Sequence, residues 1–151
     1  MIIILSDVPD QALTATAQTA GTNNAAVFGL IYNLGNAIPA LVKTENLFIL
    51  AHGAAVGDQG IPVIGSQASD FYLDAASFFD NFRSIFPANY SGSIYVDACQ
   101  SGDSFALKGG IVCPSFATSL SVRVRNIRVY GRHGNVQGGM LLPGDPAWVQ
   151  G

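Results

Sequence analysis

Hydrophobic residues gather in four short, mainly apolar runs, at residues 2–5, 47–51, 93–96 and 127–130. The first two runs contain no polar residue at all. Continuous apolar runs of this length are typical of strands that are buried on both faces, as in a parallel sheet. The pattern therefore predicts four strands of one buried sheet.

The segments between these runs follow a different pattern. Residues 24–41 and 70–86 carry apolar side chains at spacings of three and four, which is typical of a helix with one buried face. Asn23 or Asn24 and Ser69 or Asp70 are suitable N-caps. A third helix, interrupted by glycines and a proline, is predicted from residue 104 onward.

Three remaining segments have weaker signals. Residues 57–65 predict a small hairpin because glycines mark its turn. The Ala- and Thr-rich residues 11–24 favour a surface loop or a weak helical turn, and the Gly- and Pro-rich tail from residue 135 favours little regular structure. Strands that alternate with helices predict one α/β domain over residues 1–151, with a small, mostly parallel sheet flanked by helices on both faces.

Composition removes several classes of function. Of the 151 residues, 49% are hydrophobic and 11% charged, and the net charge of -3 comes without any basic run, so no nucleic-acid partner is expected. No apolar run is long enough to span a membrane, and the apolar start lacks the cationic region of a secretory signal. We expect a soluble protein, in the cytoplasm rather than secreted. The two cysteines fit no zinc signature, so neither a metal nor a cofactor is expected.

Two strand ends carry reactive side chains. His52 follows the second run and is itself followed by Gly53, and Cys99 follows the third run within a turn-forming segment. Parallel strands present their carboxyl ends at one edge of a sheet, so neighbouring strands would bring the imidazole and the thiol together. A thiol beside a general base, and near the N-terminus of a following helix, is an activated nucleophile.

The segments His52-Gly53 and Asp97-Ala98-Cys99-Gln100-Ser101-Gly102 resemble the two active-site blocks of the caspase-like cysteine peptidases. The motifs are closest to those of bacterial clostripain-like and caspase-like domains. In that superfamily one hydrophobic strand ends in His-Gly and a later one in a small residue followed by the nucleophilic Cys, with about this much chain between them, here 99 minus 52, or 47 residues. The resemblance implies a caspase-like domain over 1–151 that cleaves peptide or protein substrates without a cofactor.

The resemblance also implies roles for single residues. His52 and Cys99 form the catalytic dyad, the amides of Gly53 and Cys99 form the oxyanion hole, and His52 protonates the leaving amine. Asp97 in the matching Asp-Ala-Cys sequence lines the pocket for the residue before the cut and favours Arg or Lys. From the residues alone, Asp97 equally suits a cap of the turn or helix that follows.

Several alternatives stay open. The chain has Asp-Ala-Cys-Gln-Ser-Gly where caspases have Gln-Ala-Cys-Arg-Gly, so the acidic specificity of caspases is not implied. Little chain follows the fourth run, so a partner subunit or the tail is needed to complete a substrate groove, or the domain is inactive and binds a peptide or protein at the same edge. His133 also follows a strand and is the second candidate base, whereas Cys113, in an apolar pattern, is predicted to be an inert core residue.

Overall fold

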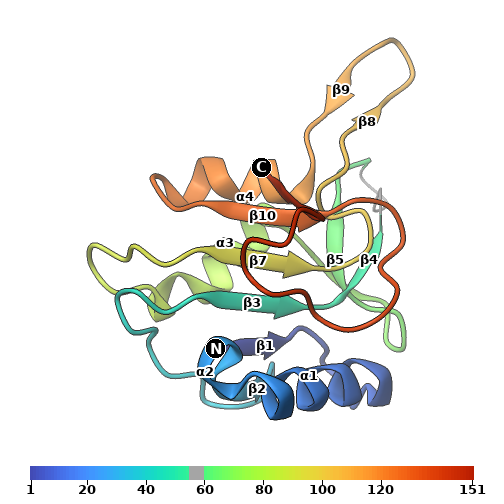
Figure 1. Ribbon diagram of the computed structural model, residues 1–151. Coiled ribbons are helices and arrows are strands. Elements are labelled where there is room, and N and C mark those ends of the chain that lie inside the picture. Colours follow the sequence, from blue (N-terminus) through green and yellow to red (C-terminus); the bar gives the residue numbers. More distant parts are fainter. Residues whose placement is uncertain (55–59) are drawn as a thin grey trace.

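The computed structural model describes residues 1–54 and 60–151, which form a six-stranded sheet with helices against it (Figure 1). The strand order is β11-β10-β7-β3-β1-β2. Strands β2, β1, β3, β7 and β10 are parallel, and β11 pairs with β10 in the antiparallel direction. In chain order the strands are β1 (Ile2–Ile4), β2 (Ile31–Asn33), β3 (Leu47–Leu50), β7 (Ile94–Asp97), β10 (Val129–Arg132) and β11 (Trp148–Gln150).

Helices cover both faces of this sheet, as the sequence predicted. The helices are α1 (Gln11–Asn23), α2 (Ala25–Phe28), α3 (Ala75–Phe82), the short 3₁₀ turn η1 (Arg83–Ile85) and α4 (Phe116–Val124). Helices α1 and α2 pack on the face that carries Ile2, Ile4 and Phe48, and α3 and α4 pack on the opposite face. The molecule is therefore an α/β domain with a mostly parallel sheet. No helix in residues 1–54 and 60–151 is long and apolar enough to cross a membrane.

Each of the four predicted runs overlaps a strand of the main sheet, although the fourth strand is Val129–Arg132 and not 127–130. The runs are apolar because buried strands need apolar side chains on both faces. All three residues of β1 and all four of β3 and β7 are buried. The core consequently has two layers, one on each side of the sheet. Phe78 and Phe116 lie in the layer under α3 and α4. In the layer under α1 and α2, Phe48 stacks on Tyr95 and contacts Phe28 edge to face.

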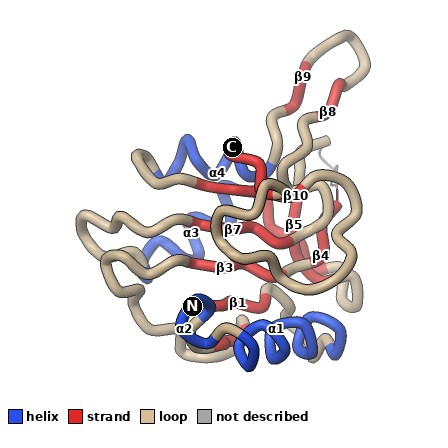
Figure 2. Tube along the Cα trace, in the orientation of Figure 1, coloured by secondary structure: helices blue, strands red, loops and turns tan. Residues whose placement is uncertain are grey.

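A second, three-stranded antiparallel sheet lies beyond the carboxyl ends of β3 and β7, at the right of Figure 1. It consists of β4 (His52–Ala54), β5 (Val63–Ser66) and β6 (Phe71–Asp74). Of the hairpin predicted over 57–65, residues 63–65 lie in β5, which pairs with β4, and residues 57–59 lie outside the described residues. A separate hairpin of β8 (Phe105–Ala106) and β9 (Val112–Cys113) projects away from the main sheet (Figure 2).

Two predictions for the first third of the chain are wrong. The segment expected to be a surface loop or a weak helical turn is the 13-residue helix α1, because Asp10 caps it and Leu13, Ala17 and Ala20 bury one face against the sheet. The helix expected over 24–41 is reduced to α2, because Gly29 adopts a φ of 66° and ends it. The chain then enters β2.

Later predictions also need correction. The helix expected over 70–86 begins only at Ala75, because residues 71–74 pair with β5 as β6 and Asp74 then caps α3. No helix follows Cys99 directly; the hairpin of β8 and β9 intervenes, and α4 starts after the Ser115 cap. Cys113 is buried as predicted, but in β9 and not in a helix. The tail, expected to be irregular, contributes β11 to the sheet.

Candidate active site

The two strands that carry the candidate residues are neighbours in the sheet. Strand β3 pairs with β7 in parallel, and Leu50 lies opposite Asp97 in the register. Two residues further along each strand are His52 and Cys99, so both leave the sheet at the same carboxyl edge, at the right of the arrows in Figure 1. The predicted juxtaposition of these two strand ends is thus present in the fold.

Gly53 brings the two strand ends into backbone contact. A β-carbon added at Gly53 would lie 2.8 Å from the Cys99 amide nitrogen and 2.7 Å from its carbonyl carbon, and closer still to the carbonyl oxygen. All of these are main-chain atoms, which no side-chain rotation can move away. The glycine after His52 is therefore required by close packing against the Cys99 peptide.

The Cys99 side chain is partly exposed, and its sulfur has one hydrogen-bond donor. The Val136 amide donates to Cys99 Sγ over 3.2 Å. This bond ties the turn after β7 to the loop that precedes β11. Among the described residues, no hydrogen bond joins this sulfur to His52.

A tight turn follows Cys99 where a helix N-terminus was expected. Gln100 adopts a φ of 58°. The Ser101 amide donates to the Ala98 carbonyl over 3.2 Å, and the Asp103 amide donates to the Gln100 carbonyl over 3.0 Å. The Ser101 hydroxyl donates to the Val96 carbonyl over 2.8 Å and accepts from the Arg132 amide over 2.9 Å. The position of Cys99 is set by this bonded turn, and not by a helix starting immediately after it.

His52 has a carboxylate partner that sequence analysis missed. Its Nε2 lies 2.8 Å from Asp10 Oδ2, and the two side chains are 27% and 10% exposed. Burial alone would raise the pKa of Asp10, but the Leu13 amide and His52 outweigh it and hold that pKa below its ordinary value. The sequence did contain a signal for this helix, because Asp10 is a suitable N-cap and stands before a segment rich in alanine.

Asp97 is close to Cys99 in the chain, but its side chain lies inside the protein. It is 2% exposed, and Arg132 Nη1 donates to its Oδ1 over 2.8 Å. Burial raises the pKa of Asp97 to about 6, although the positive charge of Arg132 opposes the shift. The guanidinium also lies 5.3 Å from the centre of the Trp148 ring. The side-chain bond of Asp97 thus goes to Arg132 and not to the following turn, and its role toward a substrate stays a prediction.

His133, the second candidate base, has a different partner. Its Nδ1 bonds to Asp103, which also accepts from the Gly134 amide over 2.8 Å. The Gln100 amide donates to the Gly134 carbonyl over 2.7 Å, so this loop is tied to the turn after Cys99. The His133 side chain is 65% exposed and bonded to Asp103, and its role as an alternative base stays a prediction.

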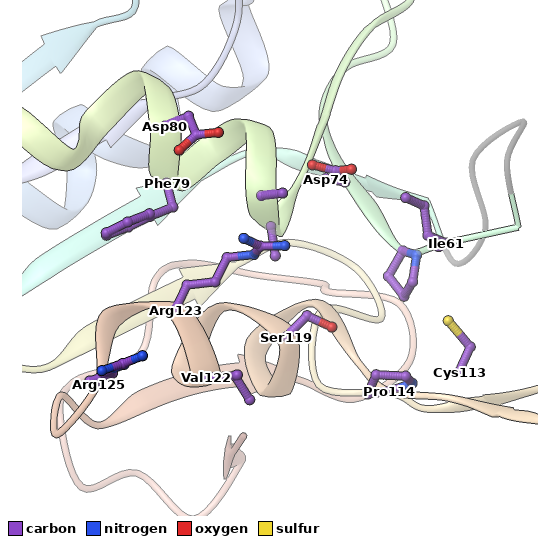
Figure 3. A pocket seen from close by; sticks show the side chains of 13 residues that line it. Ile61, Asp74, Phe79, Asp80, Cys113, Pro114, Ser119, Val122, Arg123 and Arg125 are labelled. Carbon is purple, nitrogen blue, oxygen red and sulfur yellow. The ribbon is translucent and has the colours of Figure 1, made fainter.

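A large concavity lies away from these residues. An open groove of about 680 Å³ runs between α3 and α4, with Ile61 and Cys113 at one end and Arg125 at the other (Figure 3). Neither His52 nor Cys99 lines it. Within residues 1–54 and 60–151, no three His, Cys, Asp or Glu side chains gather as a metal-binding group. The reactive side chains described at the ends of β3 and β7 include the Cys99 thiol and the His52 imidazole with its Asp10 carboxylate.

Known proteins add nothing to this description. No family model, curated protein or solved structure matches the chain. A functional assignment must therefore be argued from the chain's own residues. The features that bear on it are the paired ends of β3 and β7, the close contact of Gly53 with Cys99, and the carboxylate on His52.

Proposed function

We propose that this chain is a caspase-like cysteine endopeptidase in which His52 and Cys99 form the catalytic dyad. The observation that carries the proposal is the register of β3 against β7, which sends both residues out of the same edge of the sheet. The contact of Gly53 with the Cys99 peptide supports it, since it holds the two strand ends together through main-chain atoms. The resemblance of these segments to the caspase-like active-site blocks points to the same chemistry.

In this proposal Cys99 Sγ loses its proton to His52 and attacks the carbonyl carbon of the scissile peptide bond. The resulting oxyanion accepts hydrogen bonds from the amides of Gly53 and Cys99. His52 then gives its proton to the leaving amine, and the C–N bond breaks to leave a thioester on Cys99. Water, deprotonated by His52, hydrolyses the thioester and restores the free thiol.

The test is hydrolysis of fluorogenic peptides that end in Arg, Lys or Asn before the reporter group. We expect activity in the natural chain and its loss in Cys99→Ala and in His52→Ala. Cys113→Ser is the matched control, because it removes the other thiol of the chain and should retain activity. Turnover that is equal in the natural chain, Cys99→Ala and His52→Ala would refute the enzyme assignment.

A preference for Arg or Lys before the cut is the specific part of the proposal. It depends on Asp97, whose carboxylate already bonds to Arg132 in the buried strand end. A basic substrate side chain would have to share that carboxylate with Arg132 or replace it. Equal cleavage of Arg-, Lys- and Asn-ended peptides would remove Asp97 from the specificity pocket while leaving the dyad intact.

A catalytically silent domain that binds a peptide or a partner protein at this edge is the second candidate. It is favoured by the arrangement of the thiol, whose sulfur bonds to the Val136 amide and has no hydrogen bond to His52 among the described residues. Iodoacetamide labelling near neutral pH separates the candidates. Cys99 that reacts no faster than an ordinary exposed thiol favours the binding module, and faster reaction favours the peptidase.

A further inference from the structure

Asp10 uses its two carboxylate oxygens for two different purposes. Oδ1 accepts the Leu13 amide over 3.0 Å and so caps α1, and Oδ2 contacts His52 Nε2 over 2.8 Å. Asp10 and His52 are 42 positions apart in the chain. One carboxylate therefore joins the start of a helix to the imidazole at the sheet edge.

The contact decides which ring nitrogen of His52 is available for chemistry. A carboxylate only accepts hydrogen bonds when ionised, so the proton between the two groups belongs to Nε2 of the neutral ring. The lone pair then lies on Nδ1, which is the nitrogen left to take a proton from a thiol. When the ring becomes positively charged, the same carboxylate stabilises the charge.

We infer that Asp10 is a positioning residue of the active site, which fixes the orientation and proton placement of His52 and thereby makes it a base for Cys99. The inference rests on the proposed function and adds a third member to its dyad. Asp10 touches neither the thiol nor a substrate in this arrangement; it acts through His52.

The helix that Asp10 caps gives it a fixed position. Leu13 and Ala17 of α1 are buried against the sheet, so the first turn of α1 is held in place by the core. A carboxylate anchored on such an element can orient an imidazole more accurately than one on a free loop. The 10% exposure of the Asp10 side chain also limits the competition from water for its oxygens.

Capping alone does not require this second contact. Asp74 caps α3 in the same way, with Oδ1 accepting the Ser77 amide over 2.7 Å, and no imidazole is bonded to it. Asp74 is thus a matched control for Asp10. Serine is also a good N-cap, so replacing either aspartate by serine preserves the helix start and removes only the carboxylate.

The experiment compares Asp10→Ser with Asp74→Ser in two measurements. In peptide hydrolysis, Asp10→Ser should lower kcat by at least about tenfold with little change in KM, because a misplaced base affects chemistry rather than binding. Asp74→Ser should leave kcat unchanged. Thermal unfolding of both variants checks that they are folded and equally capped.

The second measurement reads the tautomer of neutral His52 from its ring ¹⁵N chemical shifts and does not depend on turnover. The chain has two histidines, so His133→Asn assigns the signals. The natural chain and Asp74→Ser should carry the proton on Nε2, and Asp10→Ser should lose that preference, because the carboxylate that accepts from Nε2 is gone. The spectra are repeated in Cys99→Ala, which removes the thiol as a second partner of the ring.

The outcomes for Asp10 and for the proposed function are distinct. An unchanged His52 tautomer in Asp10→Ser overturns the positioning role, whatever the activity. Loss of the Nε2–H preference together with loss of kcat supports it, and an unchanged kcat in an active chain overturns it. If the natural chain hydrolyses no peptide, the proposed function fails, and a changed tautomer still supports Asp10 as the residue that orients His52.

Discussion

Gly53→Ala tests the geometry of the site directly, because its effect follows from main-chain positions alone. The added β-carbon would lie 2.7 Å from the Cys99 carbonyl carbon, whereas ordinary contact begins at 3.4 Å. The two strand ends must therefore separate by at least 3.4 minus 2.7, or 0.7 Å, and by more at the carbonyl oxygen. Forcing an extra methyl into a packed site of this kind costs about 1–3 kcal/mol.

We expect Gly53→Ala to lower the free energy of unfolding by about 2 kcal/mol and to lower any hydrolytic activity by more than the stability loss explains. Urea titration followed by the fluorescence of Trp148, the single tryptophan, measures the first effect. Gly35→Ala is the control, because nothing lies within 4 Å of its added carbon and its change should stay within about 0.5 kcal/mol. Equal stabilities of the two variants would refute the described contact between Gly53 and Cys99.

Two further predictions concern stability. Burial raises the pKa of Asp97 from an ordinary 3.8 to about 6. Between these values the folded protein keeps a proton that the unfolded chain has lost, so the free energy of unfolding should fall by up to about 3 kcal/mol as the pH rises from about 4 to about 6. Asp97→Asn should abolish that slope in urea titrations, and persistence of the slope would assign it to other groups. Phe78 is fully buried, and its ring centre lies 4.6 Å from that of Phe82, on which it stacks. Phe78→Ala should therefore lower the free energy of unfolding by about 3–5 kcal/mol in the same assay, and Phe79→Ala, at the groove, should lower it by less. Equal losses in the two variants would contradict this difference.

The strands and the site edge could be predicted from the sequence because buried parallel strands leave a local signal. A run such as 47–51 is apolar without alternation, and the residues that follow its end must lie at the carboxyl edge. His52 and Cys99 were found on this basis. Whether the two strands that precede them are neighbours could not be predicted from the sequence. The structure shows that β3 and β7 are paired.

The first helix and the short strands were missed for a different reason. Helix α1 buries only Leu13, Ala17 and Ala20, and small alanine side chains give a weak periodic signal. Strands β2 and β6 have only three and four residues. In such short segments an alternation of apolar and polar side chains cannot be distinguished from the three- and four-residue spacing of a helix. Pairing with other strands determines the structure of β2 and β6. Because helix α1 was not predicted, its cap Asp10 was not considered as a site residue.

At the end of β7 and in the turn after it, the structure distinguishes residues that serve packing from residues that are available for chemistry. Asp97 bonds to Arg132, and Ser101 bonds to Val96 and Arg132, so both polar side chains serve the buried sheet edge. The Arg132 partner could not be predicted from the sequence, because it lies 35 positions from Asp97.

Gly102 adds a third packing residue to the same segment. Its amide donates to the Arg132 carbonyl over 2.9 Å, and a β-carbon on the facing Gly131 would lie 2.6 Å from the Gly102 nitrogen. Asp97, Ser101 and Gly102 are thus explained by packing and bonding within the fold. Cys99 is not explained in that way, because its side chain is partly exposed and the bond to its sulfur comes from the Val136 amide of another loop. Cys99 is therefore the residue of this segment that remains for chemistry, and His52 leaves the neighbouring strand at the same edge of the sheet.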